Sequence, residues 1–385
     1  MSWVLRVDDL SDLARGAAFF GTGGGGDPYV GQLMVAGAIR RYGPITLVSP
    51  DELDDDAQVI PTSMMGAPSV MMEKIPAGHE AVTALGVLEA HLGVTATHTM
   101  PVECGGINSM VPLAVGAALG LPVVDGDGMG RAFPELQMET FTLFGVHGSP
   151  LVIATERGEH VIIETGADNR RMEELARAMT IRLGGMSLLA SYSMTGAQAK
   201  ASAIPNTIAL CLSVGRALRE ARENHETLTD ALNRSLAGSV YGRASRLLKG
   251  KVVDVERRTE RGFTLGLARL AGEDGSQMEV TFQNENLIAI RDGEVAAIVP
   301  DLICIISADS YEPITTERLR YGQRIQVLAI PSPPIMNTTA GLAIFGPRAF
   351  GLDYKHSPIK ADLVPVSAAR SSEEEQVHTM KETQR

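Results

Sequence analysis

The pattern of hydrophobic and polar positions divides the chain into a mixed amino-terminal part and a carboxyl-terminal part of short apolar runs. Between residues 45 and 150, strand-length apolar runs alternate with segments of helical period. This alternation is typical of a mostly parallel sheet covered by helices. We therefore predict an α/β domain over residues 1–240. Its expected strands are 45–48, 58–62, 96–102, 122–125 and 187–191, with a hairpin at 150–165, and its expected helices are 8–20, 29–42, 78–92, 109–119, 168–183, 204–223 and 227–236.

The pattern changes after about residue 240. Apolar runs of strand length then follow one another, separated by turn sequences such as Asp274-Gly275 and Asp292-Gly293. This pattern of successive strands and turns predicts an all-β domain over residues 241–337, built as a barrel or a sandwich. Residues 338–368 are expected to return and pack on the first domain. The polar and charged residues 369–385 are expected to form a disordered tail.

The composition restricts the partners that we expect. The net charge of −12 argues against a basic face for nucleic acid. The three cysteines have no metal-type spacing, and the chain shows neither a signal-peptide pattern nor an apolar run that could span a bilayer. We therefore expect a cytoplasmic protein with a small-molecule substrate and no nucleic-acid or membrane partner. Apolar strands of the carboxyl part could form a homo-oligomer interface or that domain's own core.

A glycine-rich turn separates the first two expected helices, at residues 21–28. Gly23, Gly24, Gly25 and Gly26 are candidate ligand-binding positions, because glycine lets a ligand approach the main chain closely. The turn matches G-x-G-x-x-G, but the dinucleotide-binding fingerprint follows a strand. Since the preceding segment is predicted to be a helix, NAD or another nucleotide is not the expected cofactor.

Three later turns also combine small and polar residues, at positions 61–68, 103–109 and 125–131. Ligands of open α/β sheets bind beyond the carboxyl ends of the strands. We therefore expect these turns to line one site together with the glycine turn. The candidate substrate contacts in them are Ser63, Gly105, Gly106, Asn108 and Arg131, whose guanidinium could pair with a carboxylate.

Several motifs together resemble one family. They are Gly-Thr-Gly-Gly-Gly-Gly-Asp-Pro-Tyr at 21–29, Pro-Val-Glu-Cys-Gly-Gly-Ile-Asn-Ser at 101–109, Asp-Gly-Asp-Gly-Met-Gly-Arg-Ala-Phe-Pro-Glu at 125–135, Met-Thr-Gly at 194–196 and Gly-Pro-Arg-Ala-Phe-Gly at 346–351. From about residue 8 to 358 the chain is similar to the S-methyl-thiohydantoin desulfurase family, formerly described only as a domain of unknown function. The resemblance implies two domains and hydrolysis of a thiohydantoin-type ring, which releases a thiol or sulfide and leaves a hydantoin. It also implies a pathway link to hydantoinases and oxoprolinases, which open related rings.

Hydrolysis at a carbon that bears sulfur needs an activated water and groups that stabilise charge. Glu103 and Asp125 follow expected strand ends and are candidate general bases, although either could cap a turn or helix. Together with Asp127 they could hold a divalent metal, or Asp127 could stabilise its own turn. Lys200 is a candidate positive charge over the site, or a solvated lysine near a helix start. Cys104 is a candidate nucleophile, or a small buried side chain without a histidine partner.

These expectations favour a hydrolase that acts on a small hydantoin- or thiohydantoin-type heterocycle. The alternative is a non-catalytic or nucleotide-binding accessory subunit of a hydantoinase- or oxoprolinase-type system. The literal glycine pattern supports the nucleotide-binding version of that alternative only through its spacing.

Overall fold

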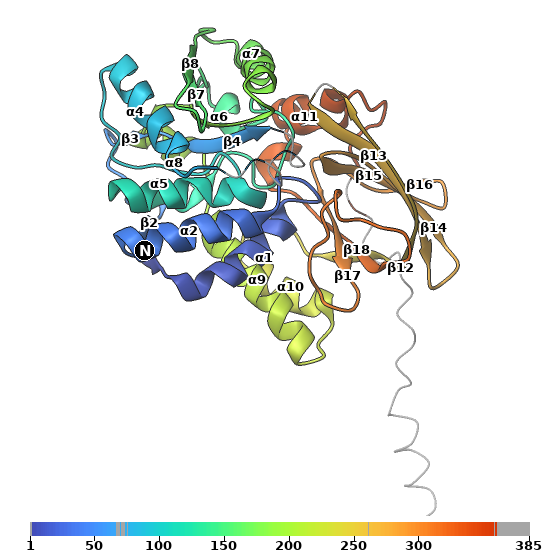
Figure 1. Ribbon diagram of the computed structural model, residues 1–385. Helices are drawn as coiled ribbons and strands as arrows, with labels where there is room; N and C mark the ends of the chain where they lie inside the picture. Colours follow the sequence, from blue (N-terminus) through green and yellow to red (C-terminus); the bar gives the residue numbers. More distant parts are fainter. Residues whose placement is uncertain are drawn as a thin grey trace, which may run out of the picture.

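The protein has two parts that lie side by side, an amino-terminal part of helices and small sheets and a carboxyl-terminal curled sheet (Figure 1). The structure is a computed structural model that describes residues 2–66, 70, 74, 76–260, 262–357 and 359. Within these residues, no helix combines the length and the apolar character needed to cross a membrane.

Apolar helix faces build the largest core of the amino-terminal part. This core brings together side chains from α1, α2, α5, α9 and α10. The expected helices are present with ends shifted by a few residues. Their bounds are α1 (Leu10–Phe20), α2 (Pro28–Tyr42), α4 (Glu80–Leu92), α5 (Val111–Leu119), α7 (Asn169–Arg182), α9 (Thr207–Glu223) and α10 (Leu228–Leu236). The structure also contains two short helices that were not predicted, α6 (Thr140–Leu143) and α8 (Gly196–Ser202).

Helices α1 and α9 contact each other through their main chains. A Cβ atom added at Gly16 of α1 would lie 1.7 Å from the carbonyl oxygen of Cys211 in α9. A Cβ atom added at Gly215 of α9 would lie 1.7 Å from the carbonyl oxygen of Asp12 in α1. Each helix therefore places a glycine against the backbone of the other, and no side chain can replace either glycine without separating the two helices.

The sheets of the amino-terminal part are mixed or antiparallel, so the prediction of a mostly parallel sheet is wrong. One sheet has the order β1-β2-β5, in which β1 is antiparallel and β5 parallel to β2. A second, antiparallel sheet has the order β4-β9-β7-β8. Two further antiparallel pairs are β3–β10 and β6–β11. The strands are β1 (Trp3–Leu5), β2 (Ile45–Val48), β3 (Gln58–Val59), β4 (Thr62–Gly66), β5 (Val123–Val124), β6 (Gly126–Asp127), β7 (Leu151–Ala154), β8 (His160–Ile163), β9 (Met186–Ala190), β10 (Met194–Thr195) and β11 (Ile204–Pro205).

The prediction failed because segment 186–205 returns along earlier strands in the opposite direction. Its strands β9, β10 and β11 pair with β4, β3 and β6, all from the first 130 residues. Such long-range pairings leave no local trace in the sequence. The expected strand at 96–102 is reduced to single parallel bridges, which join His98 to Val59 and Thr99 to Val123.

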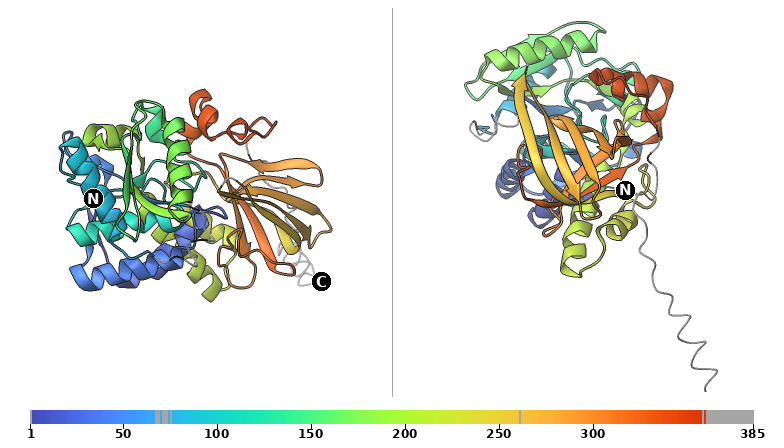
Figure 2. Two further views of the ribbon diagram at one scale, coloured as in Figure 1. Left: turned by 45° about the horizontal axis from the view of Figure 1, so that its top comes forward. Right: turned by 90° about the vertical axis from the view of Figure 1, so that its right-hand side faces the viewer.

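The carboxyl-terminal part is an antiparallel sheet with the order β16-β15-β14-β13-β12-β18-β17, which confirms the all-β prediction. The sheet curls until β17 contacts β15 and β16, and it therefore forms a half-barrel. Figure 2 shows it from two further directions. The strands are β12 (Ser245–Glu260), β13 (Phe263–Gly272), β14 (Gln277–Gln283), β15 (Glu285–Arg291), β16 (Glu294–Ile298), β17 (Leu302–Ser307) and β18 (Arg324–Ile330).

The last described segment returns to the boundary between the two parts. It contains α11 (Thr339–Phe345) and the short helix η5 (Pro347–Phe350). The rings of Phe345 and Phe350 lie 5.2 Å and 6.2 Å from the ring of Phe133, which belongs to the amino-terminal part. The expected domain change at 240/241 falls between the end of α10 and the start of β12. The expected tail at 369–385 lies outside the described residues.

Candidate functional site

The glycine-rich turn connects α1 directly to α2, and the protein itself uses several of its main-chain groups. Gly24 donates its N–H to the carbonyl oxygen of Gly21, at 2.8 Å. Gly25 donates its N–H to Oε1 of Glu285, at 3.1 Å, and accepts from the N–H of Ile107, at 2.8 Å. As predicted, a helix precedes the turn. The turn therefore packs between other segments of the protein. Among the described residues, no strand directly precedes it, although the dinucleotide-binding fingerprint requires one.

The turn also joins the two parts of the protein. Gly23 accepts hydrogen bonds from the N–H and the hydroxyl of Thr316, at 2.7 and 3.0 Å. Thr22 accepts from the N–H of Asn286, at 2.8 Å. A Cβ atom on Gly24 would lie 2.1 Å from Oε1 of Glu285. Glycine is therefore required here by close contact with the carboxyl-terminal part as well as by the positive φ of Gly23.

The second turn, at 103–109, packs against the glycine turn. A Cβ atom on Gly106 would lie 1.9 Å from the carbonyl oxygen of Gly25, and Gly106 has φ +64°. Gly105 is equally confined, because its Cβ atom would lie 2.8 Å from the carbonyl oxygen of Phe20. The sequence prediction that these two turns lie together is confirmed, and their glycines bring two main chains into contact.

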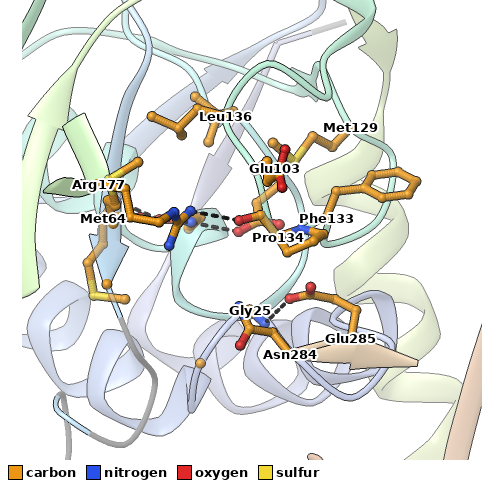
Figure 3. Close-up of a pocket in the computed structure, with 16 residues that line it drawn as sticks. Gly25, Met64, Glu103, Met129, Phe133, Pro134, Leu136, Arg177, Asn284 and Glu285 are labelled. Atoms are coloured by element: carbon orange, nitrogen blue, oxygen red, sulfur yellow. Dashed lines mark hydrogen bonds between the residues drawn. The ribbon is translucent and has the colours of Figure 1, made fainter. Parts of the chain in front are cut away.

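A small cavity of ≈ 50 Å³ lies where these turns meet the carboxyl-terminal part (Figure 3). Side chains from four segments reach it: β4, residues 102–108, residues 129–136 and residues 284–285, with one residue from α7. In Figure 3, Arg177 and Met64 lie on the side away from Glu285. The lining residues are Gly25, Gly26, Met64, Met65, Gly66, Val102, Glu103, Asn108, Met129, Phe133, Pro134, Glu135, Leu136, Arg177, Asn284 and Glu285.

Glu103 and Asn108, both predicted from the sequence, are held together at this cavity. Asn108 donates from Nδ2 to Oε1 of Glu103, at 2.6 Å, and its Oδ1 accepts from the N–H of Met64, at 2.7 Å. The other carboxyl oxygen, Oε2 of Glu103, has no hydrogen-bond partner among the described residues. Burial raises the pKa of Glu103 well above its ordinary value, and the nearby carboxylate of Glu285 raises it further. Burial and the neighbouring carboxylate therefore favour the protonated form of Glu103.

Glu285 faces the same cavity from the carboxyl-terminal part. Its side chain is buried, and Oε2 has no hydrogen-bond partner in the part of the chain that is described. Burial raises the pKa of Glu285 to about 8, although the positive charge of Arg131 and the N–H of Gly25 act in the opposite direction. Burial therefore shifts both carboxyl groups toward the protonated form, while Arg131 and the N–H of Gly25 favour the ionised form of Glu285.

Asp127 and Glu139 form a second pair of buried carboxyl groups next to Glu103. Asp127 accepts at Oδ2 from the N–H groups of Cys104 and Gly130, at 2.6 and 2.9 Å. Burial raises the pKa of Asp127 to about 7. Neither oxygen of Glu139 has a hydrogen-bond partner among the described residues, and burial raises the pKa of Glu139 well above its ordinary value. Neither side chain lines the cavity.

The isolation of Glu139 predicts a change in stability with pH. The free energy of unfolding of Glu139→Gln, relative to that of the wild type, should increase with pH above about pH 4.5. The increase should be up to about 1.4 kcal/mol per pH unit. The folded protein keeps a proton on Glu139 that the unfolded chain releases as the pH rises, so the wild type loses stability with pH and the amide does not. Urea unfolding of both proteins at several pH values measures this. A difference that stays constant with pH would contradict the prediction.

Two candidate catalytic residues lie away from the cavity. Asp125 accepts at Oδ1 from the N–H of Ile208, at 2.8 Å, and at Oδ2 from the indole N–H of Trp3, at 3.1 Å. It therefore supplies a side-chain acceptor for the first turn of α9, which is the capping role that the sequence left open. Lys200 pairs with the exposed Asp55, at 2.7 Å, and its ammonium group is not part of the cavity lining.

Arg131 and Ser63 are buried outside the cavity lining. The guanidinium of Arg131 donates to the carbonyl oxygens of Ala132, Asp301 and Asn286, at 3.1, 2.7 and 3.1 Å. Arg131 therefore ties the amino-terminal part to the carboxyl-terminal part, instead of presenting its charge to the cavity. Ser63 is fully buried in β4, and its hydroxyl has no hydrogen-bond partner among the described residues.

The metal and nucleophile hypotheses receive no support from the geometry. The part of the chain that the structure describes brings no three His, Cys, Asp or Glu side chains together in a group that could hold a metal ion. Glu103 and Asp127 are neighbours, but Asp125 faces α9. Burial raises the pKa of the Cys104 thiol well above its ordinary value, which disfavours the thiolate that a nucleophile needs.

The sequence interpretation missed the cavity residues that come from outside the four turns. Glu285 and Asn284 belong to the polar run Gln283-Asn284-Glu285-Asn286, which interrupts two apolar strands. A buried polar run between strands is an informative signal, and here it could have indicated a site. Arg177, on the helical surface of α7, and Glu139 carry no comparable signal.

Comparison with known proteins also divides the chain into two parts, but places the boundary at residues 165–167 and not near residue 240. A search of the curated proteins found no match to this chain. The X-ray crystal structure of a protein from Chromobacterium violaceum has a TM-score of 0.79 and 24% identity, covering 93% of this chain and 100% of that chain, and this likeness shows the fold. Residues 8–165 match the S-Me-THD-like N-terminal domain, and residues 167–359 match the S-Me-THD-like C-terminal domain. With nearly its whole length covered by these two matches, the chain belongs to the S-Me-THD-like family, the S-methyl-thiohydantoin desulfurase family that its motifs resemble.

Proposed function

We propose that the protein is a hydrolase that removes the sulfur substituent from a thiohydantoin-type ring. The observation that carries the proposal is the pair Glu103 and Glu285, which face one cavity from the two parts of the chain. Each is buried, and each has a carboxyl oxygen without a hydrogen-bond partner among the described residues. The family name supports the choice of substrate class.

The reaction adds water to the ring carbon that bears sulfur. The water oxygen bonds to this carbon, one water proton goes to Glu285, and the electron pair of the C=N bond moves to the ring nitrogen. The C–S bond then breaks, the electron pair leaves with sulfur, and Glu103 gives its proton to the departing thiolate. The remaining hydroxyl proton passes to the ring nitrogen, which leaves a hydantoin carbonyl and methanethiol. Transfer of the proton from Glu285 to Glu103 restores the starting state.

The two carboxyl groups suit these roles because their environments differ. The Arg131 charge and the Gly25 N–H both favour the ionised form of Glu285, the base. An ionised Glu285 in turn favours a protonated Glu103, the acid. Two neighbouring carboxyl groups that hold one proton between them are a known way to obtain an acid and a base at one pH.

The size of the cavity requires its lining to adapt to a ring. A volume of ≈ 50 Å³ holds a few waters, whereas small-molecule sites usually measure roughly 300–1,000 Å³. Met64, Met65 and Met129 line the cavity. Methionine is unbranched and has several rotatable bonds, so these side chains can move aside when a ring enters.

The pH dependence of kcat/KM follows from this assignment. The rate should rise with pH toward about 8, because Glu285 must lose its proton to act as the base and its pKa is about 8. The rate should fall where Glu103 loses the proton that it donates, and burial raises the pKa of Glu103 well above its ordinary value. A pH–rate profile for methanethiol release measures both limbs. A rate that is already maximal near pH 5, where ordinary carboxylates are ionised, would contradict the assignment.

The direct test is an assay of methanethiol and sulfide release from S-methyl-thiohydantoin and thiohydantoin, with and without a chelator. The proposal expects release by the wild type that Glu103→Gln lowers strongly and that Lys200→Met leaves nearly unchanged. Lys200 is the matched control because its ammonium group lies away from the cavity. Absence of thiol and sulfide release from both substrates, with divalent metal supplied in a parallel assay, would overturn the proposal and favour a non-catalytic role.

A further inference from the structure

Arg177 brings a positive charge to the cavity from helix α7. Its Nη2 atom donates to the carbonyl oxygen of Pro134, at 2.8 Å, and its Nε atom donates to Oε1 of Glu173. The guanidinium carbon lies 4.2 Å from the ring centre of Phe263. These contacts leave Nη1 without a hydrogen-bond partner among the described residues. Arg177 is the cationic side chain in the described cavity lining.

The contacts of Arg177 hold its side chain in one position. Glu173 accepts from Arg177 at one oxygen and from the N–H of Leu136 at the other, at 3.1 Å. Arg177 and Glu173 therefore both form hydrogen bonds with the segment 134–136, which lines the cavity. The side chains of Arg177 and Glu173 are only 13% and 5% exposed. A donor fixed before the reaction stabilises charge without first having to reorganise.

The proposed reaction creates negative charge at a place where no carboxyl group can stabilise it. When water attacks the ring carbon that bears sulfur, the C=N electron pair moves to the ring nitrogen. In the S-methyl-thiohydantoin tautomer whose C=N nitrogen is bonded to the ring carbonyl, this charge spreads to the carbonyl oxygen. Glu103 and Glu285 carry negative charge or none, and they cannot compensate the developing charge electrostatically. The site therefore needs a cationic donor at the ring carbonyl.

We propose that Arg177 is a catalytic residue whose Nη1 group donates a hydrogen bond to this ring carbonyl oxygen and stabilises the charge that water attack creates. This inference rests on the proposed hydrolase function. It defines the substrate class more closely, as cyclic S-alkyl isothioureas in which the attacked C=N nitrogen is acylated. For a ring that lacks this carbonyl, Arg177 does not stabilise the charge that water attack creates.

Two substrates and two variants test the role of Arg177. The substrates are S-methyl-thiohydantoin and the matching cyclic S-methyl isothiourea without the ring carbonyl. Arg177→Met should lower kcat for the first by roughly 100- to 1,000-fold, the usual effect of removing one such donor, and should change turnover of the second by less than about threefold. Arg171→Met is the matched control, because Arg171 lies on the same helix and pairs with Glu174 at the surface. Added guanidinium should partly restore Arg177→Ala and should not restore Glu285→Gln.

Ligand binding gives a second readout that does not need turnover. The wild type should bind hydantoin more tightly than ethyleneurea, which lacks the second carbonyl, and Arg177→Met should abolish this preference without unfolding the protein. An equal loss on both substrates, or an unchanged preference for hydantoin in Arg177→Met, would overturn the role of Arg177 while thiol release by the wild type still supports the proposed function. A wild type that neither releases thiol nor binds hydantoin would overturn both.

Discussion

Replacement of Glu285 by glutamine is expected to lower kcat for methanethiol release by about 100-fold or more. Glutamine keeps the shape of the side chain and an oxygen that can accept from the N–H of Gly25. It cannot take a proton from water, and general base catalysis by a positioned side chain contributes roughly 100- to 10,000-fold. KM should change little, because the substituted atom acts on water and not on the ring. Steady-state assays at about pH 8, the pKa of Glu285, measure the effect.

The matched control for this experiment is Glu279→Gln. Glu279 lies on the neighbouring strand β14, is exposed, and pairs with Arg269 at the surface. The substitution Glu279→Gln therefore removes a carboxyl group from the same sheet without altering the cavity. If Glu285→Gln retains more than about a tenth of the wild-type kcat, a barrier change below about 1.4 kcal/mol, Glu285 is not the base and the assignment fails.

The substitution Gly16→Ala is expected to lower the free energy of unfolding by about 3 kcal/mol or more. The added methyl group would lie 1.7 Å from the carbonyl oxygen of Cys211, which is main chain and cannot rotate away. Helices α1 and α9 must then separate, and the apolar core that they share loses its close packing. Urea unfolding monitored by circular dichroism measures the loss.

Gly37→Ala provides the opposite result from the same chemical change. Gly37 lies within α2, is exposed, and has no atom within 4 Å of an added Cβ. Alanine there should increase the free energy of unfolding by roughly 0.5–1 kcal/mol, because glycine disfavours the helix. If Gly16→Ala proves as well tolerated as Gly37→Ala, helices α1 and α9 do not pack as closely as described.

The elements that the sequence predicted well depend on local pattern. Helix 8–20 and the hairpin at 150–165 have periodic apolar positions and turn residues of their own, and both are present. The direction of the amino-terminal sheets was predicted wrongly because it depends on segment 186–205, whose pairing partners lie far away in the sequence. The hydrophobic period indicates that a segment forms a strand, but it does not indicate which strand that segment pairs with.

The same distinction explains the site. Glu103 and Asn108 were predicted because a polar turn with glycines stands out in one stretch of sequence, and both line the cavity. Asp125 has a similar local setting, but its hydrogen-bond partners Trp3 and Ile208 are distant in sequence. Through Ile208, Asp125 caps the first turn of α9. The polar run at 283–286 marks Glu285 locally, but Glu285 reaches the cavity only when the half-barrel packs on the glycine turn, and the run does not indicate that contact.

Under the proposed mechanism, the position of Glu285 also determines when the protein can first release thiol during its synthesis. Glu103 leaves the ribosome early, but its partner is encoded in the last third of the chain. A nascent chain therefore carries an isolated acid and no base until the half-barrel has emerged and folded onto the glycine turn. Truncated chains that end before β15 would then release no thiol. The same property suits the protein to fragment complementation, in which two inactive pieces report their own association by regaining turnover.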